Sequence, residues 1–123
     1  MAIREKGIRG EEFACAYLKK KGYEIVGRNW HSRFGEVDII AKQGEYIVFV
    51  EVMARQYNTM ISGMEAVNTT KQKKIVRTAA MYLLDIEEEL QPRFDVIEVK
   101  LSGENVCGIE HYESAFSSEG FLY

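Results

Sequence analysis

The sequence contains few of the residues that define several classes of protein. Its 123 residues include only two cysteines, and these follow neither a disulfide framework nor a CxxC spacing. We therefore expect reduced thiols and a cytoplasmic location. The sequence has no run of about 18 apolar residues, which predicts that no segment crosses a membrane. The segment "MAIREKGIRGEEF" also lacks the apolar stretch of a secretory signal.

An overall excess of positive charge is also lacking, because the net charge at pH 7 is -3. The charge is nevertheless uneven along the chain. Residues 1–84 contain 14 Lys and Arg against 9 Asp and Glu, whereas residues 85–123 contain 2 against 10. A basic front surface would attract a phosphate chain. Two solvated surfaces of opposite charge would explain the same counts.

The length and composition favour a single globular domain over residues 1–123. Hydrophobic residues make up 46% of the chain and charged residues 28%, as is typical of globular proteins. The one proline, Pro92, follows an acidic run and predicts a loop.

Hydrophobic periodicity predicts two helices, over residues 4–21 and from about Thr70 to Leu84. The apolar residues expected on their buried faces are Ile8, Phe13, Ala14, Tyr17 and Leu18 in the first, and Ile75, Val76, Ala79, Ala80, Leu83 and Leu84 in the second. Strands are predicted over residues 23–29, 35–42, 46–55, 93–101 and 106–113, with loops at 30–34 and 43–45 and an irregular segment at 57–68. The order αβββαββ predicts an α/β fold with one mixed sheet flanked by helices.

A carboxylate, Glu51, interrupts the most apolar predicted strand. If the hairpin loop is residues 43–44, Glu51 lies diagonally from Asp38, and a four-residue loop places the two directly opposite. Either register brings both carboxylates to one sheet face within about 4.5–8 Å. Two buried carboxylates this close need compensation, which Mg²⁺ provides. Alternatively, one of them lies at a strand end and pairs with Arg55 or Arg33.

Three stretches carry a resemblance to a known family: "GIRGEEFACAYLKKKGYEIVGRNW", "RFGEVDIIAKQGEYIVFVEV" and "TTKQKKIVRTAAMYL". They resemble the YraN family of small bacterial proteins, which is similar to archaeal Holliday-junction resolvases of the PD-(D/E)xK nuclease superfamily. The resemblance covers nearly the whole chain and implies a restriction-endonuclease-like fold, with a central mixed sheet flanked by helices.

The resemblance also assigns roles to individual residues. It implies that Asp38 and Glu51 bind Mg²⁺ or Mn²⁺, with the backbone carbonyl of Val52 as a further ligand. Other side chains would complete or border this site: Glu11 and Gln72 on the two helices, and Glu36 as a nearby helper. From the residues alone, Gln72 either reaches the site or caps the end of the apolar stripe at the surface.

The chain departs from the (D/E)xK motif at Met53, where the superfamily has lysine. That lysine would orient the attacking water and stabilise charge on the phosphate oxygens. Methionine can do neither. Three explanations are open: a naturally disabled nuclease, a relocated lysine, or an introduced substitution. The candidates for a relocated positive charge are Lys42, Lys71 and Arg55.

Basic residues in two further segments suggest contacts with phosphates. "RNWHSRF" combines arginines with Trp30 and Phe34, as in base-stacking surfaces, although both aromatic residues would also serve as core anchors. "TTKQKK" places lysines at a helix N-terminus, which favours phosphate, or on a solvated helix face. The residues predicted to bind nucleic acid are Arg28, Arg33, Arg55, Lys71, Lys73 and Lys74.

Two functions are compatible with these features. The first is a metal-dependent DNA endonuclease, acting on branched or forked DNA. The second is a non-catalytic module that uses the nuclease fold to bind nucleic acid or protein. The resemblance further implies a homodimer, because resolvase-like enzymes must cut two strands.

Overall fold

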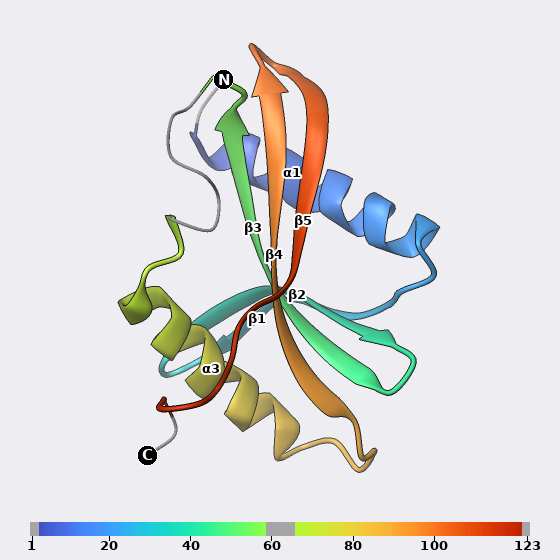
Figure 1. The fold of residues 1–123 in the computed structure, drawn as a ribbon, viewed down its shortest axis with the longest axis vertical. Coiled ribbons are helices and arrows are strands. Elements are labelled where there is room, and N and C mark those ends of the chain that lie inside the picture. The colour runs from blue at the N-terminus through green and yellow to red at the C-terminus, as the bar shows by residue number, and fades with distance from the viewer. Residues whose placement is uncertain (1–2, 59–65, 122–123) are drawn as a thin grey trace.

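The computed structural model describes residues 3–58 and 66–121, with side chains described from Gly10 onward. Its elements are α1 (Ile3–Lys20), β1 (Glu24–Ser32), β2 (Gly35–Gln43), β3 (Tyr46–Gln56), α3 (Thr69–Leu83), β4 (Gln91–Ser102) and β5 (Asn105–Phe116). The predicted α/β class, the αβββαββ order of these elements and the mixed sheet between helices are confirmed (Figure 1).

The sheet is built from antiparallel neighbours and one parallel pair. Its strand order is β1-β2-β3-β4-β5. β1, β2 and β3 pair antiparallel, as do β4 and β5, whereas β3 and β4 are parallel. A parallel pair requires a crossover connection, and here that connection contains α3. β3 therefore lies in the middle of the sheet, between a hairpin and a crossover.

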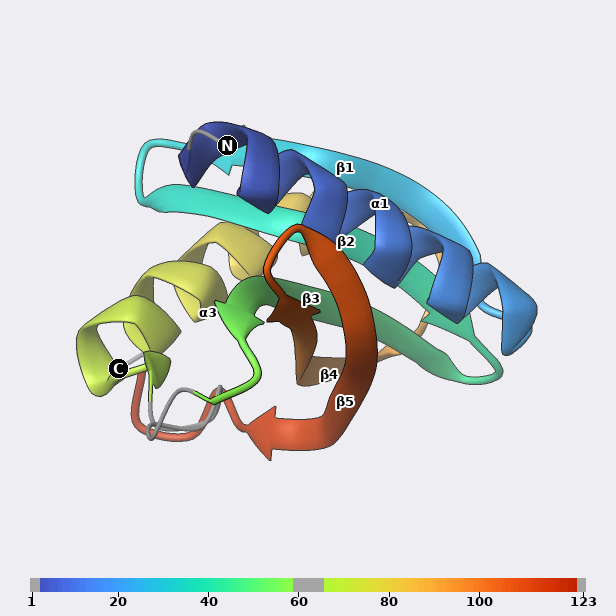
Figure 2. The ribbon, with the colours of Figure 1, turned by 90° about the horizontal axis from the view of Figure 1, so that it is seen from above.

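Both faces of β3 are covered, and α1 and α3 lie on its opposite sides (Figure 2). Val48 and Val50 belong to the buried cluster under α1, whereas Ile47 and Phe49 belong to the cluster under α3. All four side chains are fully buried. Burial of each contributes about 1.5–3 kcal/mol. Glu51 follows these four apolar residues directly and is buried as well, with 8% of its surface exposed.

The first helix approaches the sheet closely at a glycine. A Cβ atom added to Gly10 would lie 3.0 Å from the Cβ of Ala54 in β3. Any larger residue would push the helix outward, because close-packed interiors tolerate little added volume. The following residue, Glu11, is thereby carried to the sheet.

One predicted loop is instead largely strand. β1 continues through Ser32, which pairs with Gly35, so the connection to β2 is confined to Arg33 and Phe34. The loop prediction for residues 30–34 is wrong because Trp30 packs edge-to-face on Tyr82 of α3 at 5.3 Å. This contact holds the end of β1 against α3.

Pro92 also lies in a strand, where a loop was expected. It is the second residue of β4 and pairs with Ile47. Proline is tolerated at the beginning of a strand, where a missing N–H costs little.

Two residues of the predicted apolar faces are exposed. Leu84 is 77% exposed. Because α3 ends at Leu83, helical spacing no longer predicts on which face the Leu84 side chain lies. Phe13 is 42% exposed, at the edge of a face centred on the fully buried Ala14 and Leu18. The side chain of Ile8, and residues 59–65 of the predicted irregular segment, lie outside the described residues. Within the described part of the chain, no helix has the length and apolar character needed to cross a membrane.

Candidate active site

The register of the β2–β3 hairpin places two carboxylates on one face. Gln43 pairs with Tyr46 across a two-residue turn, and the last pair of the ladder is Ile39 with Val50. Asp38 and Glu51 are the residues directly beyond this last pair. These pairs follow the register predicted for a four-residue loop, although Gln43 and Tyr46 also pair, so that the turn itself has two residues, 44 and 45. The other predicted register, with residues 43–44 as the turn, is wrong. Gly44, with φ of 56°, supplies the left-handed conformation that such a turn needs.

Beyond this last pair the two strands separate. The Val52 N–H donates a hydrogen bond to Asp38 Oδ2 at 2.8 Å. A side-chain carboxylate thus replaces the ladder partner of a strand N–H, which leaves the Asp38 side chain fixed against β3. Asp38 and Glu51 are each 8% exposed.

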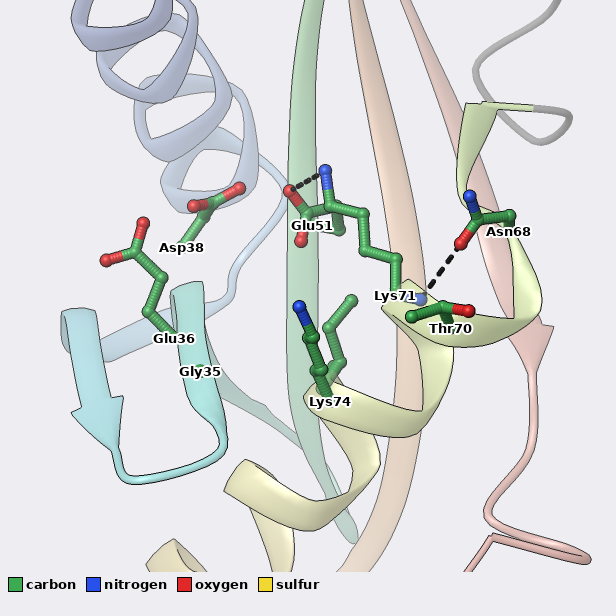
Figure 3. A pocket seen from close by; sticks show the side chains of 9 residues that line it. Gly35, Glu36, Asp38, Glu51, Asn68, Thr70, Lys71 and Lys74 are labelled. Carbon is green, nitrogen blue, oxygen red and sulfur yellow. Dashed lines mark hydrogen bonds and ion pairs between the residues drawn. The ribbon is translucent and has the colours of Figure 1, made fainter.

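The separation of the strands opens a hollow of about 540 Å³ between β2, β3 and the beginning of α3 (Figure 3). Its wall combines acidic and basic side chains. The lining residues are Gly35, Glu36, Asp38, Glu51, Asn68, Thr70, Lys71, Lys74 and Ile75. The hollow is therefore open to solvent and polar, with the two predicted carboxylates at its inner wall.

A third carboxylate joins the pair from the other helix. Glu11 of α1 lies within hydrogen-bonding range of Asp38, and Asp38 lies within the same range of Glu51. Burial, reinforced by the Glu51 carboxylate, raises the pKa of Asp38 from 3.8 to about 7. Burial, followed by the charge of Asp38, raises the pKa of Glu11 above its ordinary value of 4.5. The row thus holds more negative charge than its surroundings neutralise.

Cations approach the two ends of this row. Arg28 lies 3.8 Å from Glu11, and Lys71 Nζ lies 3.2 Å from Glu51 Oε1. Among the described residues, no ion pair reaches Asp38 in the middle. Within the described residues, the cations therefore contact the two outer carboxylates, whereas Asp38 accepts the Val52 N–H.

Asn29 also contributes to the site, although the sequence did not reveal it. Its side chain forms a hydrogen bond that favours the ionised form of Glu11. Its φ is 49°, a conformation that asparagine adopts more readily than most residues. An asparagine inside a predicted strand was the only signal, and strained backbone of this kind often accompanies functional sites.

Lys71 is the candidate for a relocated charge that meets Glu51 (Figure 3). Asn68 caps α3, and its side chain accepts a hydrogen bond from the Lys71 N–H at 3.0 Å. The cap fixes the first turn of the helix from which Lys71 extends. This cap was missed, although asparagine followed by threonine before a predicted helix is a known signal. Lys42 pairs instead with Glu88, remote from the hollow.

Met53 contributes apolar packing where the motif has lysine. It lies two residues beyond Glu51, and its partly buried side chain packs against the cluster under α3. The residue at the position predicted for a catalytic lysine therefore packs at the edge of the hydrophobic core. The positive charge next to Glu51 comes from Lys71 on the helix.

The remaining predicted residues are distributed around the hollow. Glu36 lines it and lies 3.2 Å from His31. Gln72 does not line it, because its side chain donates to the Val67 carbonyl at 2.9 Å and so ties down the beginning of α3. Lys74 lines the hollow, whereas the exposed Lys73 and the partly buried Arg55 do not.

The donor set suits a hard divalent cation. In residues 10–58 and 66–121, no three His, Cys, Asp or Glu side chains are grouped so that they could hold a metal ion together. Mg²⁺, however, usually binds one or two carboxylates and keeps several waters. Asp38 and Glu51 form such a pair beside an open hollow. Burial, and then the Glu51 carboxylate, raises the pKa of Asp38, and a bound cation would favour its ionised form.

The fold and the arrangement of these carboxylates define the class of the protein. The chain has a restriction-endonuclease-like fold, with the acidic pair on two adjacent strands of the sheet. Residues 10–99 match the profile of "Uncharacterised protein family UPF0102".

Relatives of this family are similar to nearly the whole chain. A UPF0102 protein of Thermodesulfovibrio yellowstonii is 42% identical over 116 residues, covering 94% of this chain and 99% of the relative. A UPF0102 protein of Alkaliphilus oremlandii is 46% identical over 113 residues, covering 89% and 96%. A third, from Caldicellulosiruptor saccharolyticus, is 44% identical over 118 residues, covering 94% and 100%. The chain belongs to the UPF0102 family, the YraN family of the resemblance.

Proposed function

We propose that the protein is a metal-dependent nuclease that hydrolyses phosphodiesters in forked or branched DNA. The observation that carries this proposal is the row of Glu11, Asp38 and Glu51 at the wall of an open hollow, with Lys71 against Glu51. A buried row of acids is destabilising for the fold alone. Its placement beside a basic helix end fits a site for a cation and a phosphate.

The proposed cation is Mg²⁺ or Mn²⁺, held by the carboxylates of Asp38 and Glu51 and the backbone carbonyl of Val52. When bound, it would supply Lewis-acid activation of the phosphoryl group and of a water. Glu11, which interacts with Asp38, would border this site without adding a third ligand from the described residues. In the hydrolysis, the water gives up a proton as its oxygen bonds to phosphorus. The bond from phosphorus to the leaving sugar oxygen breaks, and that oxygen takes up a proton, which leaves a phosphate monoester and a sugar hydroxyl.

Lys71 takes the part of the motif lysine in this proposal. Its ammonium lies 3.2 Å from Glu51, and its side chain is 43% exposed, so it has access to a phosphate in the hollow. It would donate hydrogen bonds to the phosphate oxygens on which charge builds up. Lys74, on the next turn, lines the same hollow and would hold the strand by a further phosphate contact.

Cleavage of defined DNA in the presence of Mn²⁺ tests this function. We expect the unmodified protein to cut a forked duplex with a single-stranded arm. Asp38→Asn should abolish that cleavage, because it removes a carboxylate proposed to bind the cation. The absence of cleavage on single-stranded, duplex, forked and four-way DNA would instead favour the non-catalytic binding module.

A charge reversal at the start of α3 tests the DNA-binding surface. Replacing Lys73 and Lys74 by glutamate should weaken binding about equally for all sequences, because phosphate contacts carry no sequence information. The slope of log affinity against log salt should fall by up to about 2, since each lost duplex phosphate contact contributes about 0.9.

The matched control reverses Lys19 and Lys20, two exposed lysines at the other helix. It changes the net charge equally and should leave affinity and salt slope almost unchanged. Equal effects of the two double variants would show that the binding follows net charge and that α3 makes no specific contact.

A further inference from the structure

A short basic and aromatic turn is fixed rigidly next to the candidate active site. It joins β1 to β2 and consists of Arg33 and Phe34. Ser32 Oγ accepts a hydrogen bond from the Phe34 N–H at 3.0 Å and lies 2.8 Å from Thr78 Oγ1. Thr78 is fully buried in α3. The turn is therefore attached to the helix by a side-chain hydrogen bond, which preorganises its residues.

Two arginines from different elements lie over one aromatic ring. The guanidinium carbon of Arg33 is 4.9 Å from the centroid of the Phe34 ring, and that of Arg77 is 5.7 Å from it. Arg33 is exposed, whereas Phe34 and Arg77 are partly buried. The three residues form what we call the arginine–phenylalanine cluster: Arg33, Phe34 and Arg77.

The cluster borders a hollow of its own, of about 210 Å³. This volume is below the roughly 300–1,000 Å³ of sites that enclose a drug-sized ligand, so it suits a single flat group. The lining residues are Arg33, Phe34, Arg77, Ala80, Met81 and Phe121. Apolar walls with two guanidiniums match a nucleobase with its neighbouring phosphate, because bases stack on aromatic rings and on arginine.

The cluster lies next to the lysines of the candidate active site along α3. Lys71, Lys74 and Arg77 follow one another at three-residue intervals, which places neighbouring side chains on one side of a helix. At 1.5 Å per residue they span about 9 Å. Gly35, the residue directly after Phe34, lines the larger hollow, and a Cβ added to it would lie 3.4 Å from Lys74 Cβ.

We propose that the arginine–phenylalanine cluster binds an unpaired base of a DNA strand whose backbone runs along Lys71, Lys74 and Arg77. At 3.4 Å of rise per nucleotide, about 9 Å corresponds to two or three nucleotides. The bound base lies that far from the phosphate next to Glu51. Bases within a continuous duplex are stacked on one another, so the cluster selects DNA with a single-stranded segment. The placement of the cut phosphate rests on the proposed function, whereas the base site itself does not.

Binding measured without divalent metal tests the cluster separately from catalysis. Fluorescence anisotropy in EDTA would compare a thymidine oligonucleotide, an abasic oligonucleotide of equal length and a continuous duplex. Phe34→Leu should weaken binding of the thymidine oligonucleotide by about 5- to 150-fold, the range expected for losing one aromatic stacking contact. Binding of the abasic oligonucleotide and of the duplex should change by less than about twofold, because no base occupies the cluster in either.

Two further variants make the result specific. Arg77→Lys keeps the charge but removes the flat guanidinium, and it should lower thymidine binding while sparing the abasic oligonucleotide. Phe13→Leu changes an aromatic residue on α1 that is also exposed, and it should have no effect. Circular dichroism of each variant confirms that the fold is intact.

The other outcomes are decisive as well. Equal loss for the thymidine and abasic oligonucleotides, or no loss with Phe34→Leu, would overturn the base site. Mn²⁺ titration of Phe34→Leu separates this from the proposed function, since the metal site should be unaffected. If the unmodified protein binds no metal but its DNA binding depends on the base, the base site would be supported and the proposed nuclease activity would be refuted.

Discussion

Replacement of Lys71 by methionine is expected to slow metal-dependent cleavage by about 10²–10³, the usual loss when one group that stabilises transition-state charge is removed. The ammonium that lies 3.2 Å from Glu51 would be absent. Mn²⁺ binding should be retained or become tighter, because Glu51 would no longer be neutralised by a lysine. Single-turnover cleavage and calorimetric metal titration would measure the two effects independently.

Met53→Lys then distinguishes the explanations for the missing motif lysine. If Lys71 has taken over the role, Met53→Lys should change the rate of the unmodified protein by less than about tenfold, because the charge is already present. The same substitution in the Lys71→Met background should restore much of the lost rate. The fold should tolerate it, because a lysine stem can lie along the apolar cluster with its ammonium toward Glu51.

The opposite pattern would refute a relocated lysine. A normal rate for Lys71→Met, together with a gain of about 10² or more for Met53→Lys, would identify a nuclease disabled at residue 53. If none of these variants is active while all of them still bind metal, the non-catalytic module would be favoured over the nuclease.

The metal-free protein is expected to lose stability as the pH rises from about 4 to about 7. The pKa of Asp38 is 3.8 in an ordinary environment and about 7 in the folded protein, through burial and then Glu51. The folded state binds the Asp38 proton more strongly than the unfolded state does. The stability that this proton contributes is therefore complete below pH 3.8 and is lost as the pH rises through the folded-state pKa of about 7. Each pH unit between the two values corresponds to about 1.4 kcal/mol, so the total is about 4 kcal/mol.

Asp38→Asn should remove this pH dependence. At pH 8 in EDTA, the variant should be more stable than the unmodified protein by roughly 2–4 kcal/mol. At pH 4 the two should be nearly equal, since the amide oxygen can still accept the Val52 N–H bond. Urea unfolding at both pH values measures the difference. Glu36→Gln, an exposed change of equal charge on the rim of the hollow, is the control and should shift stability by less than about 0.5 kcal/mol. A similar stability change for Asp38→Asn at both pH values would contradict the buried charge.

The sequence predicted the parts of the fold that depend on local patterns. The apolar stretch around Glu51 indicated a central strand, and an even-length hairpin loop placed Asp38 on the same face. The exact turn was not predictable, because a pairing shifted by two residues keeps every side chain on its face. The observed pairs, from Ile39 with Val50 to Gln43 with Tyr46, follow the register predicted for the four-residue loop, and Asp38 and Glu51 line one hollow.

Contacts between distant elements were beyond the reach of sequence patterns. A lysine has several rotatable bonds, so its spacing on α3 predicted a basic helix end but not its meeting with Glu51. The polar side chain expected to border the site, Gln72, donates instead to the carbonyl of Val67, which lies just before its helix.

A second polar network was also missed. Asp95 is fully buried and accepts hydrogen bonds from Arg93 and from the Ser114 N–H, and it lies 2.7 Å from His111 Nε2. These hydrogen bonds lower the pKa of the Asp95 carboxyl despite its burial. These residues lie near the beginning of β4 and near the end of β5, which are far apart in the sequence. Only the β4–β5 register brings them together.

Calorimetric titration with Mn²⁺ tests most directly whether Asp38 and Glu51 form a metal site. The unmodified protein should bind one equivalent at neutral pH and release protons on binding, because the metal displaces the proton that Asp38 carries at a pKa of about 7. Asp38→Asn and Glu51→Gln should each lose that binding, while Glu36→Gln keeps it. Indistinguishable titrations of the unmodified protein and Asp38→Asn would show that the carboxylate pair does not bind metal.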